Sequence, residues 1–145
     1  MIVLDTNVIS ELTRPAPEPG VVSWLDSLPA GEVGTTAVTA AELLYGVARM
    51  PDGRRKTELT AAVRGLLGED FRGRVLPFDE HCAPRYADIV CGREALGRPI
   101  GVADAQIAAI CRTAEATLAT RNTDDFSGTG IDLINPWKPD RPEPV

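Results

Sequence analysis

The sequence predicts an open α/β fold, in which helices pack on both faces of a sheet of parallel strands. Short apolar segments typical of strands alternate along the chain with longer amphipathic segments typical of helices. This alternation favours β–α–β connections and a parallel sheet. Acidic or amide residues also recur where the strand-like segments end. In parallel sheets these positions share one edge, the carboxyl ends of the strands, where ligands bind.

The first elements are one strand and two short helices. A strand is predicted at residues 2–5, almost at the first residue. A short helical segment at residues 8–13 stops before Pro15, because proline cannot continue a helix. Apolar residues at helical spacing predict the next helix at residues 21–28, which ends at Pro29.

The middle of the chain continues with a strand and two helices. A strand at residues 33–38 is followed by a helix at 40–49, which the Pro-Asp-Gly turn at 51–53 closes. Residues 56–67 form the next helix, with apolar side chains on one side. The helix at 40–49 is apolar nearly all round, so either it lies centrally in the domain or a partner helix covers it.

The last third contains three strands and two helices. A strand at residues 74–78 leads to a helix at 82–96, whose proline falls near the start, where proline is tolerated. A helix at 103–114 precedes a strand at 116–120, and a final strand is predicted at 131–134.

Length and composition predict one ordinary domain. The 145 residues, 43% of them apolar, suffice for a buried core. We expect a single domain over residues 1–137 and a flexible, proline-rich tail at 138–145. No apolar run approaches the roughly 20 residues of a membrane span, and the first residues lack the features of a signal peptide. Cytoplasmic localisation without membrane contact is the expectation.

Cysteine and histidine usage restricts the possible chemistry. The three cysteines form no C-x-x-C pair and indicate reduced, structural thiols. His81 is the sole histidine, which excludes a two-histidine acid–base ribonuclease and a multi-histidine zinc site. A metal ion would be held chiefly by oxygen, and this favours magnesium or manganese.

The charge balance neither supports nor excludes a nucleic-acid ligand. The net charge of −6 differs from the basic footprint usual in such proteins. Basic residues do cluster at Arg49, Arg54, Arg55 and Lys56, and Arg121 lies beside the last acidic group.

Acidic and amide side chains mark four junctions after or between predicted elements. They are Asp5, Glu42, Asp104, and Asn122 with Asp124 and Asp125. Carboxylates gathered at one sheet edge repel one another unless protons or cations intervene. A hard divalent cation that prefers oxygen ligands is the expected partner.

Each junction also has a local structural explanation. Asp5 can cap the following helix. Thr39 and Glu42 match the capping box, in which the glutamate reaches back to the N-cap amide. Asp104 lies in a first helical turn, where the helix dipole stabilises a carboxylate. Residues 120–125 can be a plain polar loop. Capping does not exclude metal binding at the same side chain.

Five sequence blocks follow one another along the chain. They are Met1-Ile2-Val3-Leu4-Asp5-Thr6-Asn7-Val8-Ile9-Ser10, Thr39-Ala40-Ala41-Glu42-Leu43, Ala103-Asp104-Ala105-Gln106-Ile107-Ala108-Ala109, Ala119-Thr120-Arg121-Asn122 with Asp125-Phe126, and Ile134-Asn135-Pro136-Trp137. In this order, the blocks resemble PIN-domain proteins of the VapC/FitB toxin type over nearly the whole chain.

The resemblance implies a PIN-like three-layer α/β/α fold with a five-strand parallel sheet. It also implies a Mg²⁺- or Mn²⁺-dependent endoribonuclease, the toxin of a type II toxin–antitoxin system. A cognate antitoxin, an RNA substrate, a homodimer, and operator DNA bound only through the antitoxin are the implied partners. The metal-site roles fall on Asp5, Glu42 and Asp104.

The fourth site position departs from the family pattern. Many relatives carry an aspartate where this chain has Asn122. An amide oxygen can still bind a metal or orient its water, but it adds no negative charge. Asp124 or Asp125 can supply the missing carboxylate, and Asp125 is slightly favoured. The number of bound metals therefore stays open.

The mechanistic hypothesis gives each acidic side chain a task. Asp5 is the central ligand, Asp104 completes the ligand set, and Glu42 holds or deprotonates the attacking water. Arg121 either contacts a substrate phosphate or forms a solvated salt bridge.

Two rival functions remain. One is a catalytically weak module that acts mainly in an antitoxin–operator DNA complex. The other is a phosphotransferase with Asp5 as nucleophile, which fits less well because Asn7 replaces the usual second aspartate.

Overall fold

Five parallel strands form one sheet in the computed structural model, which describes residues 1–139. The strands are β1 (Ile2–Leu4), β2 (Val33–Thr36), β3 (Val75–Leu76), β4 (Thr117–Ala119) and β5 (Leu133–Ile134). Their order is β3-β2-β1-β4-β5, and every neighbouring pair is parallel. From β1 the chain first adds β2 and β3 on one side of β1, and it then adds β4 and β5 on the other side. The strand order therefore reverses between β1 and β4, where α/β sheets open a crevice.

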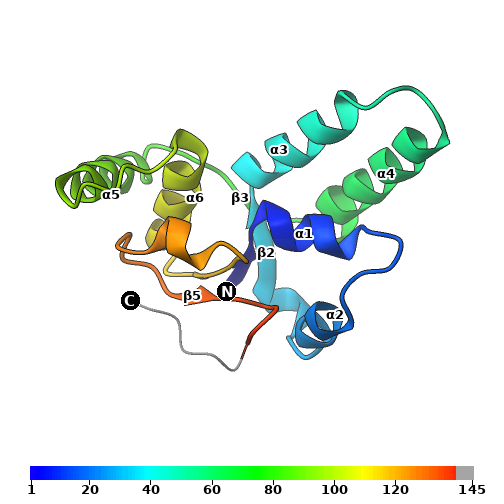
Figure 1. Ribbon diagram of the computed structural model, residues 1–145, viewed down its shortest axis with the longest axis horizontal. Coiled ribbons are helices and arrows are strands. Elements are labelled where there is room, and N and C mark those ends of the chain that lie inside the picture. The colour runs from blue at the N-terminus through cyan, green and yellow to red at the C-terminus, as the bar shows by residue number, and fades with distance from the viewer. Residues whose placement is uncertain (140–145) are drawn as a thin grey trace.

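Helices cover both faces of the sheet and complete the predicted three layers (Figure 1). The helices are α1 (Thr6–Leu12), α2 (Pro19–Asp26), α3 (Ala37–Ala48), α4 (Arg54–Gly65), α5 (Ala83–Ala95) and α6 (Val102–Thr113). Short helical turns lie at Ala30–Glu32, Leu66–Asp70 and Thr123–Phe126. Helices α1 to α4 pack on one face and α5 with α6 on the other. The predicted fold class is confirmed.

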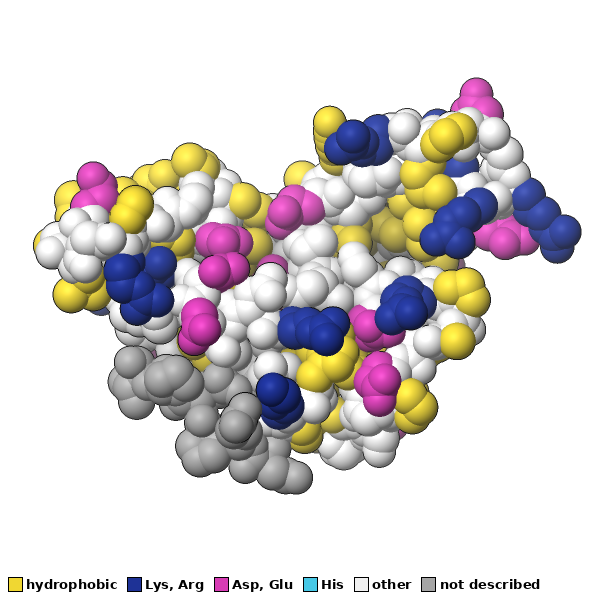
Figure 2. Space-filling view, viewed as in Figure 1, with side chains coloured by type: hydrophobic (Ala, Val, Ile, Leu, Met, Phe, Trp, Pro, Cys, Tyr) yellow, Lys and Arg dark blue, Asp and Glu magenta, His cyan; other side chains and the backbone are white. Residues whose placement is uncertain are grey.

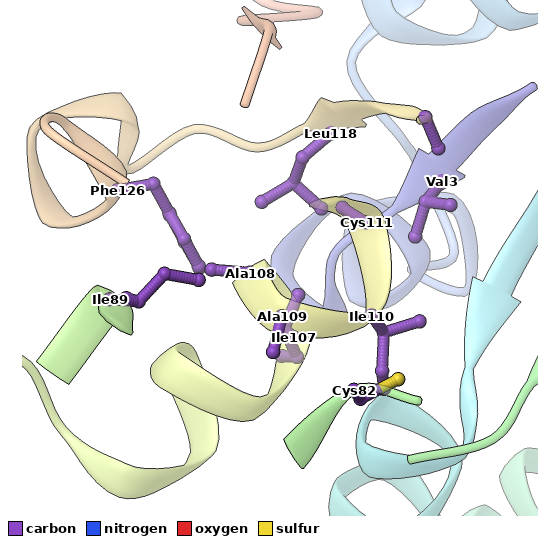
Figure 3. Close-up of a cluster of buried hydrophobic side chains, with 11 residues drawn as sticks. Val3, Cys82, Ile89, Ile107, Ala108, Ala109, Ile110, Cys111, Leu118 and Phe126 are labelled. Atoms are coloured by element: carbon purple, nitrogen blue, oxygen red, sulfur yellow. The ribbon is translucent and has the colours of Figure 1, made fainter. Parts of the chain in front are cut away.

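Two apolar clusters form the core, one on each face of the sheet. Successive side chains of a strand point to opposite faces. Accordingly, Val3 of β1 belongs to the cluster under α5 and α6, and Leu4 belongs to the cluster under α1 to α4. Leu118 and Ala119 of β4 divide in the same way. Figure 3 shows the first cluster, in which α6 side chains pack between α5 and the strands.

The boundary between β2 and α3 differs from the prediction. The sequence predicted a strand over residues 33–38 and a helix from residue 40, but the strand ends at Thr36 and the helix begins at Ala37. Thr36 is the N-cap, and its hydroxyl oxygen accepts a hydrogen bond from the Thr39 amide at 3.0 Å. The valines and threonines of this segment resemble a strand because β-branched residues favour one. The cap ends the strand two residues earlier.

The helix α3 is buried along one side, so it is not central in the domain. Thr39, Leu43 and Val47 are buried, whereas Tyr45 is 57% exposed. Of the two explanations for its apolar character, the central position is therefore wrong. The Arg49 guanidinium lies over the exposed Tyr45 ring, 5.5 Å from its centroid.

The predicted tail is described only in part. Of the tail predicted at 138–145, residues 140–145 lie outside the described residues. No helix among residues 1–139 combines the length and the apolar character that crossing a bilayer requires.

Candidate active site

A hollow of about 510 Å³ lies at the carboxyl ends of the central strands. Its lining includes the three predicted carboxylates, Asp5, Glu42 and Asp104, together with Asn122. In the space-filling view this face is hollowed, and acidic and basic side chains gather around the depression (Figure 2). Residues 5, 42, 104 and 122 are thus brought together from four separate segments.

Asp5 follows β1 directly and caps α1. The residue is buried, with 6% of its surface exposed. Oδ1 accepts a hydrogen bond from the Thr6 amide at 2.8 Å, and Oδ2 accepts one from the Thr120 hydroxyl at 2.8 Å. The capping contact and the place in the hollow therefore coexist in the same side chain. The two hydrogen bonds hold the carboxylate in one orientation and leave further lone pairs for a ligand.

Asn7 connects the end of β1 to the end of β4. Its Nδ2 donates to the Thr120 hydroxyl at 3.2 Å, and its Oδ1 accepts from the Arg121 amide at 3.1 Å. The Thr120 hydroxyl also accepts from the Asn122 amide at 3.1 Å. The polar side chains at the switch point thus form one network that fixes the backbone around Asp5.

Glu42 does not form the capping box with Thr39 that the sequence pattern suggested. Because Thr36 is the N-cap of α3, Thr39 lies inside the first turn and Glu42 lies in the second. The capping-box alternative is wrong for this reason. The Glu42 Oε1 instead accepts a hydrogen bond from the Thr6 hydroxyl at 2.9 Å. This contact ties α3 to α1 and turns the carboxylate to the hollow.

Asp104 lies in the first turn of α6 and is half-buried. The pKa of its carboxyl is raised from 3.8 to about 6, and the largest cause is burial, because the charged form loses hydration. Repulsion from neighbouring carboxylates adds to this rise, in the order Asp5, Asp125, Glu42, and the positive charge of Arg93 opposes it. The proton affinity shows that negative charge is concentrated here.

Burial also raises the pKa of Asp5. The hydrogen bonds from Thr120 and Thr6 oppose this rise, since they stabilise the charged form. The negative charges of Glu42 and Asp125 then add to it. The Asp5 carboxylate is fixed in place by hydrogen bonds, but burial and negative neighbours disfavour its charged form. A bound cation would stabilise that charged form.

The three candidates for the fourth position lie differently. Asn122 is exposed and lines the hollow. Asp125 is outside the lining, but its charge raises the pKa of both Asp5 and Asp104. Asp124 is also outside the lining, and its carbonyl oxygen accepts hydrogen bonds from Arg98 and Ser127.

Arg93 is a buried cation behind the acidic hollow. It is 5% exposed. Its Nη1 donates to the carbonyl oxygens of Asp125 at 2.8 Å and Ser127 at 3.1 Å, and its Nε donates to the Arg98 carbonyl at 2.7 Å. Arg93 thus clamps the turn at 123–126 against α5 and sets the position of Asp125.

The other end of the hollow is basic. Arg14 donates to both carboxylate oxygens of the buried Glu11 at 3.0 Å. The Glu18 amide lowers the pKa of Glu11 through a hydrogen bond, and Arg14 contributes further. Arg121 lies over the ring of Trp137, with 4.8 Å from guanidinium carbon to ring centroid. Arg14, Arg121 and Trp137 all line the hollow.

The donor atoms of the hollow fit a hydrated, hard divalent cation. Among residues 1–139, no three acidic, histidine or cysteine side chains form a group placed to hold a metal ion. Magnesium does not need one, because it keeps several waters and binds through one or two carboxylates. The donors present are carboxylate and amide oxygens, and a cation would relieve the repulsion that raises the pKa of Asp104.

Sequence reasoning missed Arg93 and the bridging contacts of Asn7. Arg93 lies four residues after the buried Ile89 on α5, so an arginine on the apolar side of a predicted helix was the available signal. Thr120 and Arg121, the partners that Asn7 bridges to, lie 113 and 114 residues away in the chain, and no local pattern indicates them.

A comparison with known families and proteins finds similarity along nearly the whole chain. A family model described as the PIN domain matches residues 2–131. The VapC ribonuclease Y4jK of Sinorhizobium fredii is 42% identical over 139 residues, which cover 96% of this chain and 99% of that protein. Toxin FitB of Neisseria gonorrhoeae is 44% identical over 137 residues, which cover 94% of this chain and 99% of that protein.

Two solved structures are similar along nearly the whole chain. The structure of FitAB bound to the IR36 DNA fragment contains a chain with a TM-score of 0.89 and 43% identity, covering 94% of this chain and 96% of that one. The crystal structure of FitAcB from Neisseria gonorrhoeae has a TM-score of 0.85 and 42% identity, covering 94% of this chain and 99% of that one.

Proposed function

The chain belongs to the PIN-domain family, and from this membership we propose that it is the toxin of a type II toxin–antitoxin pair. Its activity is that of a metal-dependent endoribonuclease, which hydrolyses phosphodiester bonds of RNA. The names of its relatives, a VapC ribonuclease and the toxin FitB, support the same class.

The observation that carries the proposal is the convergence of Asp5, Glu42 and Asp104 on one hollow. Their positions in the sequence are far apart, and each has a local reason to exist. Their electrostatic coupling, visible in the raised pKa of Asp104, goes beyond those local reasons. Such clusters of perturbed carboxyl groups in a cleft are typical of catalytic sites.

The side chains divide the work as follows. Asp5 and Asp104 would hold a Mg²⁺ or Mn²⁺ ion, which supplies charge neutralisation for the phosphoryl oxygens when bound. Glu42 keeps one carboxylate oxygen beyond its bond to Thr6 and accepts the proton of the attacking water. Asn122 orients water with its amide, and Asp125 adds negative charge behind Asp104.

Removal of the Asp5 charge tests the mechanism. In Asp5→Asn the amide keeps the shape of the carboxylate but loses its charge. We expect cleavage of a fluorescently labelled single-stranded RNA, in Mg²⁺ or Mn²⁺, to fall at least ~100-fold, since metal-site charge stabilises the transition state by several kcal/mol. Chelation of the metal by EDTA should have a comparable effect on the wild type.

The control is Asp88→Asn, which removes an exposed charge from α5 outside the hollow. It should cut RNA at the wild-type rate. Equal cleavage by Asp5→Asn, with a wild-type circular dichroism spectrum, would rule out the mechanism. The RNA sequence that is cut can be read from the same reaction products.

The proposed assembly is a homodimer bound to a cognate antitoxin. The solved FitAB complex with DNA is the supporting relative, and operator DNA would be contacted through the antitoxin. The net charge of −6 supports this division, because the chain itself repels DNA. Light scattering of the chain with and without a co-expressed antitoxin measures both mass and stoichiometry.

A second candidate function is a catalytically weak module that serves mainly the operator complex. Asn122 is the observation in its favour, because an amide stands at the hollow where a carboxylate would strengthen metal binding. Asn122→Asp separates the two. Little change in cleavage supports the nuclease, whereas a large gain from a nearly inactive wild type supports the regulatory module.

A further inference from the structure

We propose that Arg121, oriented by Trp137, binds a phosphate of single-stranded RNA next to the bond that is cut. This inference rests on the proposed ribonuclease function and adds the feature that positions the substrate strand. Arg121 would be the substrate-binding residue, and Trp137 would be a positioning residue that acts through it.

The first argument is the place of Arg121 in the site. It directly follows Thr120, whose hydroxyl holds Asp5. The Arg121 amide donates to Asn7 at 3.1 Å, so its backbone belongs to the network around the acidic site. The Arg121 side chain lines the same hollow as Asp5, Glu42 and Asp104. A phosphate at Arg121 would therefore belong to the strand whose next phosphodiester reaches the carboxylates.

The second argument is the support that Trp137 provides. The Trp137 ring packs at the edge of the core cluster that contains Leu4 and Ile9, and its amide donates to the Asn135 side chain at 3.0 Å. The Arg121 guanidinium lies 4.8 Å from the ring centroid. A stacked guanidinium keeps its N–H donors at its edges, where a phosphate can reach them. Because the ring limits the side chain's freedom, binding loses less conformational entropy.

The third argument is the difference between the two arginines of the hollow. Arg14 is already neutralised by the buried Glu11, with two contacts of 3.0 Å. Arg121 forms no ion pair among residues 1–139. Arg121 makes the smallest of the contributions that lower the pKa of Glu11. The Arg121 charge is therefore the one available to an anionic ligand.

The fourth argument is electrostatic need. The chain carries a net charge of −6, and four carboxylates line the hollow, of which only Glu11 is paired with an arginine. An RNA strand therefore approaches against repulsion. A bound cation offsets this at the bond that is cut, but not at the neighbouring phosphate. An arginine at the edge of the hollow supplies that second point of attachment, in the bidentate geometry suited to phosphate.

Binding is measured apart from catalysis in the Asp5→Asn background, where the RNA stays intact. The probe is a fluorescein-labelled, ten-nucleotide single-stranded RNA in Mg²⁺, followed by anisotropy at several salt concentrations. We expect Arg121→Gln to weaken binding about tenfold and to reduce the slope of log K against log salt by about 1. Arg121→Lys should recover part of the affinity, because it restores charge without the planar fork.

The matched control is Arg72→Gln, which removes the same charge from an exposed arginine before β3, at the opposite edge of the sheet. Its affinity and salt slope should equal those of the background. The proposal is overturned if Arg121→Gln binds RNA as tightly as the background does. It is also overturned if Arg121→Gln and Arg72→Gln weaken binding by the same amount, since only overall charge would then matter.

The part played by Trp137 has its own readouts. In the otherwise wild-type protein, Trp137→Leu should raise KM more than it lowers kcat. Trp24→Phe leaves Trp137 as the sole tryptophan, and its emission should change when a phosphate binds the guanidinium that is stacked on its ring. A lower kcat with an unchanged KM and no fluorescence response would show a purely structural role, and would overturn the assignment.

The two proposals fail in different ways. If the wild type cleaves RNA but Arg121→Gln binds it as tightly as the background does, the phosphate site is wrong and the nuclease stands. If the wild type neither binds nor cleaves RNA in the presence of Mg²⁺ or Mn²⁺, both are wrong.

Discussion

The Asp104 carboxyl is the side chain at which burial and neighbouring charge act most visibly. Its pKa of about 6 lies above the ordinary 3.8. Between these two pH values the folded protein binds more protons than the unfolded chain. The free energy of unfolding therefore decreases as pH rises through this window.

Asp104→Asn should remove this pH dependence. In EDTA, we expect the wild type to lose stability relative to Asp104→Asn as pH rises from 3.8 to about 6. Urea denaturation at a series of pH values measures the difference. Added Mg²⁺ at neutral pH should restore stability to the wild type more than to the variant. Parallel pH curves for the two proteins would contradict the electrostatic argument.

Arg93 is a second residue whose effect can be measured alone. Arg93→Met keeps much of the buried volume but leaves the carbonyl oxygens of Asp125, Ser127 and Arg98 without their donor. We expect a loss of about 2–3 kcal/mol in the free energy of unfolding. Arg85→Met, at an exposed position on the same helix, should change stability by less than about 0.5 kcal/mol.

At the scale of elements, the start of α3 decides where Glu42 points. Thr36 caps the helix, and Glu42 follows in its second turn. Thr36 and Thr39 are completely buried, so no water can replace the Thr36 hydroxyl as acceptor for the Thr39 amide. Thr36 thus ends the strand β2 and caps the helix α3.

Thr36→Ala should therefore cost about 1–2 kcal/mol, the range of a lost N-cap. Cleavage should fall as well, because the first turn carries Thr39 and fraying there displaces Glu42. Chemical denaturation and the RNA assay measure the two effects. Thr57→Ala, an exposed threonine in the first turn of α4, serves as the control and should change neither. A harmless Thr36→Ala would show that the cap does not hold the helix.

At the scale of the whole molecule, charge separates the tasks of the chain and its proposed antitoxin. With a net charge of −6, the chain alone should not bind duplex DNA at physiological salt. Its complex with the antitoxin should bind the DNA upstream of the gene pair. Anisotropy with the chain, the antitoxin and the complex measures this directly. Tight binding by the chain alone would contradict the proposed division.

The order of the strands in the sheet brings residues that are distant in sequence together at the acidic site. Asp5 and Thr120 follow β1 and β4, which are neighbours although 115 residues separate the two side chains. The hydrogen bond between them crosses the switch point. Parallel strands bring their carboxyl ends to one edge, so residues that follow different strands meet there.

The amino-acid sequence by itself determined the fold class and the candidate carboxylates. Alternating strands and helices are short-range patterns of apolar residues, and Asp5 and Asp104 stand at element ends that such patterns reveal. The family resemblance added the nuclease hypothesis. Boundaries were less accessible, since the β-branched residues at 33–38 suggested a strand that Thr36 in fact ends.

Only the tertiary structure decided what these side chains do to one another. The rejection of the Thr39–Glu42 capping box, the clamp of Arg93 and the link through Asn7 all depend on partners distant in sequence. The same holds for the raised pKa of Asp104 and for Arg121 over Trp137. Burial and through-space electrostatics depend on distances in three dimensions, and those distances arise only when the strands have assembled in their order.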